Sequence, residues 1–251
     1  MKANVTRYFD QVARPRTPKG RARLVTERLA ELYPGTAKDL CALNHESPFE
    51  LLEATILSAQ CTDERVNMVT PVLFGKYPDP EALASADPED VEEIIRTTGF
   101  FRSKTKSLIG MAAAVVERYG GEVPSELEDL VTLPGVGRKT GNVVRSVAFG
   151  RPGLPVDTHV LRCSERLGLT EQLTPTERRD AVKVEQELNS FIPAGERGTF
   201  SLRMILHGRE TCVARKPRCA ICPLRDFCPF VRYASQPGSF GLFFGNSYVT
   251  G

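Results

Sequence analysis

The sequence shows neither a long apolar run nor the pattern of a secretory signal, and these two absences narrow the class of protein. None of its apolar stretches approaches the ~18 residues that a membrane-spanning helix needs. Residues 1–23 have no apolar stretch after their basic side chains, which argues against a secretory signal. Without secretion, the seven cysteines do not predict a disulfide framework. We therefore expect a cytoplasmic protein with no membrane partner. A transit peptide is the alternative, because residues 1–23 are rich in Arg and poor in acids.

The chain also has almost no excess of basic over acidic residues, since the formal net charge is only +2. The distribution of charge is more informative than its sum. The first 23 residues hold seven basic side chains against one acid, Asp10. A basic arm over residues 1–21 could neutralise phosphates and release counterions. The alternative is a solvated, flexible arm that binds nothing.

Apolar spacing predicts an all-α chain, because sustained period-two alternation is absent. Leu24, Val25, Leu29 and Leu32 mark a first helix that ends at Pro34-Gly35. Further helices are predicted over residues 48–59, 62–77, 103–119 and 138–148, and from Asp87 onward. Short Gly/Pro connections suit compact helix packing. Residues 231–251 are rich in Gly, Ser and Phe, and we expect a poorly ordered C-terminal extension there.

The stretch LPGVGRKT at residues 133–140 joins two of the predicted helices. Its glycines permit a tight turn and let backbone N–H groups approach an anion closely. The following helix N-terminus also favours negative charge, so this hairpin could hold a phosphate without reading base sequence. We assign DNA contacts to Gly135, Val136, Gly137 and Arg138. The alternative is a turn that only reverses the chain.

Lys139 and Asp157 are the candidate catalytic residues. A helix N-terminus disfavours an ammonium, and burial would do so further, whereas a neutral amine attacks carbon and forms Schiff bases. The alternative for Lys139 is one more phosphate contact. Asp157, in VDTH at residues 156–159, could accept a proton or stabilise positive charge on a sugar. Most Asp residues at a helix start are N-caps, which is the alternative for Asp157.

Four cysteines crowd into residues 212–228 with the spacing C-x6-C-x2-C-x5-C. They are Cys212, Cys219, Cys222 and Cys228. Four thiolates this close predict a metal site, although the set serves both structural zinc and iron–sulfur centres. Three basic side chains lie between the first two cysteines: Arg215, Lys216 and Arg218. A loop fixed at both ends that carries three cations predicts contact with phosphates, against the alternative of a merely solvated loop.

Together these motifs resemble endonuclease III, a family of helix-hairpin-helix DNA glycosylases. The matching segments are SPFELL at 47–52, SAQ at 58–60, GEVP at 121–124, LPGVGRKT at 133–140, VDTH at 156–159, ILHGR at 205–209 and ARKPRC at 214–219. The resemblance spans residues 22–230. It implies a six-helix domain over 41–151, and a second domain of 22–40 plus 152–230 that holds a [4Fe–4S] cluster. DNA would lie in the cleft between the two domains.

The resemblance also implies a mechanism and a substrate. Lys139 matches the family's nucleophile and Asp157 its catalytic carboxylate. The damaged nucleotide would be flipped out of the duplex, since its C1′ is otherwise inaccessible. Lys139 would displace the base, and the Schiff base would permit β-elimination. Substrates would be oxidised, ring-saturated or fragmented pyrimidines, or abasic sites, in double-stranded nucleoid DNA of a bacterium, and the enzyme would be a monomer.

Two further residues match DNA contacts of the family. Gln60 matches a residue that fills the gap left by flipping, and Phe100 falls where a Leu wedge is common. A ring at position 100 could stack on bases, whereas a core aromatic is the alternative. Cys61 and Gly141 stand where Ala is common, and Gly141 should cost its helix ~1 kcal/mol relative to Ala. Asp63 belongs to the same active-site segment as Gln60.

Two rival functions remain open at this point. A monofunctional relative such as the adenine glycosylase shares the hairpin and the cluster but has no lysine at the catalytic position, so Lys139 argues against it. The second rival is a non-catalytic DNA-binding protein with structural zinc. That protein would be colourless and would form no borohydride-trapped adduct with damaged DNA.

Overall fold

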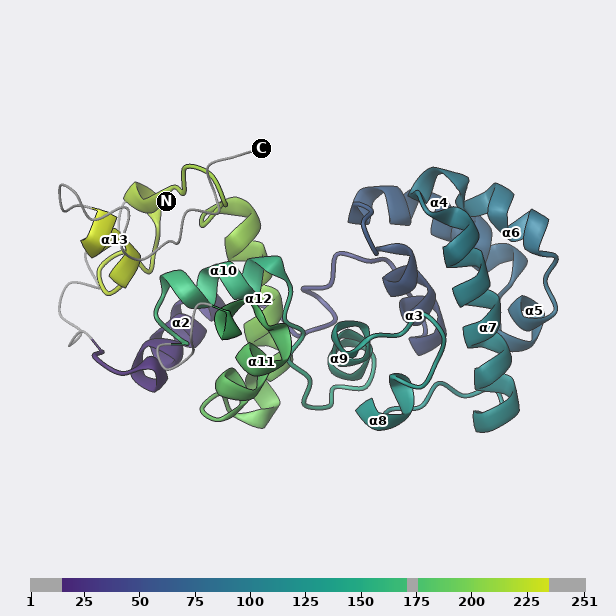
Figure 1. The fold of residues 1–251 in the computed structure, drawn as a ribbon, viewed down its shortest axis with the longest axis horizontal. Coiled ribbons are helices and arrows are strands. Elements are labelled where there is room, and N and C mark those ends of the chain that lie inside the picture. The colour runs from purple at the N-terminus through teal and green to yellow at the C-terminus, as the bar shows by residue number, and fades with distance from the viewer. Residues whose placement is uncertain (1–14, 171–175, 235–251) are drawn as a thin grey trace. The chain divides into compact units, whose positions relative to one another are not determined.

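The computed structural model describes residues 15–170 and 176–234, and these residues form helices joined by short loops (Figure 1). They contain no strand, which confirms the all-α prediction. None of their helices is both long and apolar enough to cross a membrane. The chain divides into two compact units. Unit 1 comprises Met1–Pro34, Val156–Pro193 and Arg203–Gly251, and unit 2 comprises Gly35–Pro155 and Ala194–Leu202.

Unit 2 is built from seven α-helices and one 3-10 helix in its continuous segment. They are α3 (Pro48–Leu57), α4 (Asp63–Lys76), α5 (Pro80–Ala84), α6 (Pro88–Ile95), η2 (Arg96–Thr98), α7 (Phe101–Tyr119), α8 (Leu127–Leu130) and α9 (Arg138–Val147). Helix α3 is its centre, because every residue of α3 except Pro48 and Glu50 is buried. It contacts α4, α7 and α9, while α5 and α6 pack on α7. This core holds the α8–α9 hairpin in place.

Unit 1 contains helices from both ends of the chain. They are α2 (Pro18–Leu32), α10 (Thr158–Arg166), η3 (Glu177–Arg179), α11 (Ala181–Asn189), the last part of α12 (Arg197–Glu210), η5 (Cys219–Ile221) and α13 (Pro229–Ala234). The short η4 (Ala194–Glu196) precedes α12. Arg28 of α2 ties the two ends of unit 1 together. Its guanidinium makes two hydrogen bonds to the Asp226 carboxylate and donates to the Pro223 carbonyl at 2.6 Å.

Local sequence explains where these helices begin. Four of them start with Pro in the first turn, after a residue whose side chain accepts a backbone N–H. These N-cap residues are Thr17, Ser47, Asp79 and Asp87. Proline fits the first turn because its missing N–H has no intrahelical partner there, and the cap satisfies a neighbouring donor. Both contributions are local, so the sequence alone predicts these starts.

The expected extent of the basic arm is wrong at its C-terminal end. Helix α2 already begins at Pro18, and Arg21 is only 7% exposed. Its guanidinium donates to the carbonyls of Gly168 and Arg16, so this cation is structural rather than available to phosphates. Residues 1–14 lie outside the described residues. At the other end, α13 continues to Ala234, four residues into the expected extension, and 235–251 lie outside the described residues.

Candidate active site and metal centre

The hairpin before α9 is a tight turn anchored in unit 2. Gly135 has φ +77, and a Cβ there would lie 2.6 Å from Cβ of Ser107 on α7, so only glycine fits. The N–H of Val136 donates to the Leu133 carbonyl at 3.1 Å, and the Val136 side chain is buried. Val136 anchors the turn, because its N–H and its side chain are both occupied within the protein, and its assignment as a DNA contact stays a prediction.

Gly137 differs from Gly135. Its backbone is extended, and a Cβ would meet no atom within 4 Å, so neither the turn nor packing requires glycine here. Gly137 is the N-cap of α9 and offers no side chain to accept a hydrogen bond from the first turn. The backbone N–H groups of the first turn of α9 therefore have space beside them for an external anion. This favours phosphate binding over a turn that only reverses the chain.

Lys139 is exposed at the second position of α9, directly after exposed Arg138. It has charged and titratable neighbours in unit 2. Burial raises the pKa of the Cys41 thiol, and the charges of Asp63 and Lys139 also act on that thiol. Asp63 and Lys139 thus both act on Cys41, while a role of Asp63 in the active-site segment of Gln60 stays a prediction. Cys41 is a member of this neighbourhood that no sequence motif indicated.

Asp157 is the N-cap of α10 in unit 1. Its Oδ1 accepts hydrogen bonds from the N–H groups of His159 and Val160, both at 2.8 Å. No group within residues 15–170 and 176–234 donates to Oδ2, and the side chain is half-buried. One oxygen is therefore a structural cap and the other is available for chemistry. That Asp157 acts together with Lys139 of unit 2 stays a prediction.

The VDTH and ILHGR segments, 46 residues apart, are packed together within unit 1. Arg162 of α10 donates to the Gly208 carbonyl at 2.9 Å. A Cβ on Gly208 would lie 2.8 Å from Cβ of His159, so the glycine lets α10 and α12 approach closely. This contact fixes the start of α10, and with it the carboxylate of Asp157.

Three residues predicted to contact DNA share an unusual backbone. Among the described residues, only three non-glycine residues have positive φ: Gln60 (53), Phe100 (47) and Lys216 (55). All three are exposed, and the Phe100 side chain is not a core aromatic, since the residue is 68% exposed. Such a backbone costs on the order of 1–3 kcal/mol at each residue, and exposure brings no packing to offset it. Strain at exposed positions is typical of functional sites.

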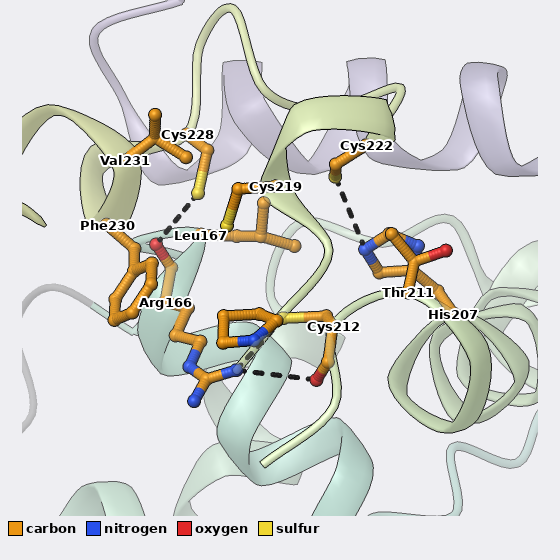
Figure 2. Close-up of a pocket in the computed structure, with 11 residues that line it drawn as sticks. Arg166, Leu167, His207, Thr211, Cys212, Cys219, Cys222, Cys228, Phe230 and Val231 are labelled. Atoms are coloured by element: carbon orange, nitrogen blue, oxygen red, sulfur yellow. Dashed lines mark hydrogen bonds between the residues drawn. The ribbon is translucent and has the colours of Figure 1, made fainter. Parts of the chain in front are cut away.

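The four cysteines line one pocket in unit 1, as Figure 2 shows. The rest of its wall is mostly apolar and includes Leu167, Phe230 and Val231. No three His, Cys, Asp or Glu side chains in the described part of the chain are grouped closely enough for one metal ion. The chemistry of four thiols in a mostly apolar wall fits a [4Fe–4S] cluster as well as a zinc ion.

Neighbours of this pocket favour a thiolate at Cys212, whereas burial raises the pKa of the Cys219, Cys222 and Cys228 thiols. Arg166 Nη1 lies 3.4 Å from Sγ of Cys212 and donates to the Val213 carbonyl at 2.8 Å, so it also fixes the start of the basic loop. A hydrogen bond from Cys163, helped by His207 and Arg166, lowers the pKa of Cys212 to about 4. His207 Nε2 lies 3.8 Å from Sγ of Cys222 (Figure 2). These neighbours suit an anionic cluster, because hydrogen bonds to the sulfurs stabilise it.

The basic loop of the cysteine segment is exposed. Arg215, Lys216 and Arg218 all face solvent, between cysteines that hold the loop at both ends. The solvated-loop alternative leaves the strained backbone of Lys216 unexplained.

Comparison with known proteins identifies the family of the chain. Residues 54–193 match the HhH-GPD superfamily of base excision DNA repair proteins, and residues 212–228 match the iron–sulfur binding domain of endonuclease III. Endonuclease III of Synechocystis is 50% identical over 84% of this chain and 93% of its own length, and that of Bacillus subtilis is 43% identical over 80% and 89%. The chain belongs to the endonuclease III family.

Solved structures of the family agree with this assignment. A trapped endonuclease III–DNA covalent intermediate is 41% identical, with a TM-score of 0.77 over 87% of this chain and 99% of that one. The protein is a DNA glycosylase with lyase activity that acts in base excision repair, and its partner is DNA. It carries a [4Fe–4S] cluster, which decides against zinc. The monofunctional rival is likewise not supported.

Several residues of these sites were not found from the sequence. Arg166 and Cys163 support the cysteine pocket, yet neither belongs to the cysteine spacing. Lys104 is buried beside the strained turn at Phe100, but its sequence context, SKTK, is that of a surface helix. In each case the role comes from tertiary packing, which leaves no local pattern.

Proposed function

We propose that this enzyme removes oxidised, ring-saturated or fragmented pyrimidines from double-stranded DNA and then cleaves the strand, with Lys139 as nucleophile. The position of Lys139 carries the proposal. It is an exposed amine in the first turn of a helix whose N-terminus is open to a phosphate. A nucleotide whose phosphate contacts Gly137 and Arg138 would bring its sugar near that amine.

The chemistry requires Lys139 as a free amine. Its nitrogen attacks C1′ of the extruded nucleotide, the glycosidic bond breaks, and the base leaves with a proton. Opening of the sugar ring gives a Schiff base between Lys139 and C1′. Loss of a C2′ proton then expels the 3′ phosphate. Asp157 stabilises the positive charge on the sugar through Oδ2, while the N–H groups of His159 and Val160 hold Oδ1.

Exposed residues of both units would hold the DNA. Gly135 shapes the hairpin, and Gly137 and Arg138 bind a phosphate. Phe100 stacks on bases beside the lesion, and Gln60 fills the gap left by the flipped nucleotide. Arg215, Lys216 and Arg218 neutralise further phosphates. The strained backbones of Gln60, Phe100 and Lys216 support these roles, since no internal contact of an exposed side chain explains them.

We propose that units 2 and 1 are the two domains expected from the resemblance, the six-helix domain and the cluster domain. Their bounds differ from the expected ones, because residues 35–40 and 194–202 belong to unit 2. DNA would contact both domains, with Lys139 supplied by one and Asp157 by the other. We further propose a monomer that acts on nucleoid DNA of a bacterial cytoplasm.

Borohydride trapping on duplexes that each carry one lesion tests the proposal. The native protein should give a covalent adduct with oxidised pyrimidines and with abasic sites. K139A should abolish both the adduct and strand cleavage while duplex affinity stays within about threefold, because one exposed charge contributes little to binding. Lys106, an exposed lysine of α7, supplies the matched control K106A, which should trap normally. An adduct that persists in K139A would refute the assignment of the nucleophile.

A further inference from the structure

Lys104 is a buried lysine that the reaction scheme does not use. It is the fourth residue of α7 and is 5% exposed. Its Nζ donates to the backbone carbonyl of Thr98 at 2.8 Å, a bond that is itself buried. An ammonium has three donors, and no second acceptor for it is found among the described residues. Its burial therefore costs stability that this single bond does not fully offset.

Its place in α7 adds to this cost. The first turn of α7 contains no acidic residue, and its N-cap, Phe100, makes no side-chain hydrogen bond. A cation near a helix N-terminus opposes the helix dipole. Burial and helix electrostatics both disfavour the charge of Lys104, so stability alone does not account for a lysine at this position. The contacts of its ammonium indicate that reason.

The ammonium of Lys104 binds the strained turn that precedes α7. Thr98 is 2% exposed, and its Oγ1 donates to the Ile95 carbonyl at 2.8 Å. Directly after it, Gly99 has φ 72 and Phe100 has φ 47, so two consecutive residues lie in the positive-φ region. The hydrogen bond from Lys104 holds the carbonyl at the start of this turn. The N–H of Lys104 donates to the Phe100 carbonyl at 3.0 Å, which holds its end.

Burial lowers the pKa of Lys104, in keeping with an ammonium that has a single acceptor among the described residues. The turn that this ammonium holds is the one that presents Phe100 at the surface of unit 2.

We propose that Lys104 is a positioning residue for DNA opening, which holds the turn of Phe100 ready to enter the duplex beside the lesion. It does not touch the substrate. The inference rests on the proposed function only for the role of Phe100.

The test separates duplex opening from bond chemistry. A duplex with a stable abasic analogue and 2-aminopurine as the neighbouring base reports local unstacking by fluorescence. K104M should reduce the rise in fluorescence and slow trapping on duplex abasic DNA by about tenfold, the scale of one hydrogen bond from a charged group. Trapping on single-stranded abasic DNA should stay within about twofold, because no partner strand has to be opened.

Three comparisons distinguish positioning from a general loss of structure. K104R keeps a cation and a donor and should restore most of the fluorescence rise. In the F100A background, K104M should have little further effect, since Lys104 acts through that turn. K106M, which removes an exposed lysine two positions away, should behave like the native protein. Unfolding midpoints of all variants identify any that fold poorly. If K104M is one of them, K104R is compared with the native protein in its place.

The outcomes that overturn the proposal are specific. Equal losses by K104M on single-stranded and duplex DNA would give Lys104 a structural or chemical role. Independent losses in K104M and F100A would show that it does not act through Phe100. If the native protein trapped no DNA at all, the proposed function would fail, while the fluorescence rise, which needs no chemistry, would still test Lys104.

Discussion

Gly135 and Gly137 are two residues apart, yet an added methyl group would meet different surroundings at each. At Gly135 it would clash with Ser107 and force a left-handed backbone on alanine, whereas at Gly137 it would project into open space. G135A should therefore destabilise the protein by about 2 kcal/mol or more. G137A should cost only about 1 kcal/mol, because alanine is a poorer N-cap than glycine but meets no clash at this position.

Duplex affinity, unlike stability, should be strongly affected in G137A. G137A places a methyl group where a phosphate would sit, so duplex affinity should fall although the fold is intact. Urea unfolding and salt-dependent binding of the same preparations measure both effects. Normal affinity in a folded G137A would contradict phosphate binding at this helix N-terminus.

Asp157 combines a structural and a chemical role in two different oxygens. D157N keeps an oxygen that can accept from the N–H groups of His159 and Val160, since Asn is as good an N-cap as Asp. It should preserve stability within about 0.5 kcal/mol but slow base removal greatly, because the negative charge is gone. D157A should be slow and also lose about 1 kcal/mol of stability. Single-turnover rates and urea unfolding separate the effects, and near-normal catalysis by D157N would leave Asp157 as a cap only.

At the scale of elements, the contact between α2 and the cysteine segment depends on Arg28. Its side chain is buried, pairs with Asp226 and lies 5.1 Å from the ring centroid of Phe227. R28M should cost about 2–3 kcal/mol, because Asp226 would be left without its cation, and should accelerate cluster loss to a chelator. Urea unfolding and the decay of visible absorbance measure these changes. The exposed i,i+4 pair of Arg23 and Glu27 supplies the control R23M, expected within about 0.5 kcal/mol of native.

The helices were predictable to the extent that their signals are local. The helices predicted over 48–59, 62–77 and 138–148 correspond to Pro48–Leu57, Asp63–Lys76 and Arg138–Val147 in the structure. Their ends depend on caps and breakers that lie within a few residues. The four cysteines and the hairpin were also evident, because their spacing is short.

What escaped prediction depends on neighbours from other elements. Lys104 and Lys106 are alike in sequence, yet only Lys104 is buried. Gly141 is similar: a Cβ there would lie 2.8 Å from Cδ1 of Leu127, so this chain brings α8 close to α9 at that point. Closer packing of α8 on α9 thereby offsets the low helix propensity of Gly141, and a propensity scale does not include such packing.

For the whole molecule, stability should depend on pH through Glu53. This carboxyl is fully buried in the centre of α3, and neither oxygen has a hydrogen-bond partner among the described residues. Burial, and next the charge of Glu50, raises the pKa of Glu53 well above its ordinary value. The folded protein thus retains a proton that the unfolded chain releases. Its stability should fall as pH rises from the ordinary value of 4.5 toward the raised one.

The variant E53Q cannot ionise and should lose this dependence. The stability of E53Q relative to the native protein should grow as the pH rises above the ordinary value of 4.5, by about 1.4 kcal/mol for each unit by which the pKa of Glu53 is raised. Thermal unfolding of both proteins across that range measures the difference. A constant difference would mean that Glu53 keeps the same protonation in the folded and unfolded states.

The ion pair of Arg28 joins residues that are 198 positions apart, and this separation orders events during synthesis. Helix α2 leaves the ribosome early, whereas Pro223 and Asp226, which bind its Arg28 guanidinium, follow only when nearly the whole chain is made. The continuous stretch Gly35–Pro155 emerges after α2 and before Asp226. It can therefore form most of its own contacts before the ion pair of Arg28 forms. A ribosome that stops before residue 226 would therefore release a chain that has the Lys139 hairpin but an incomplete cluster unit.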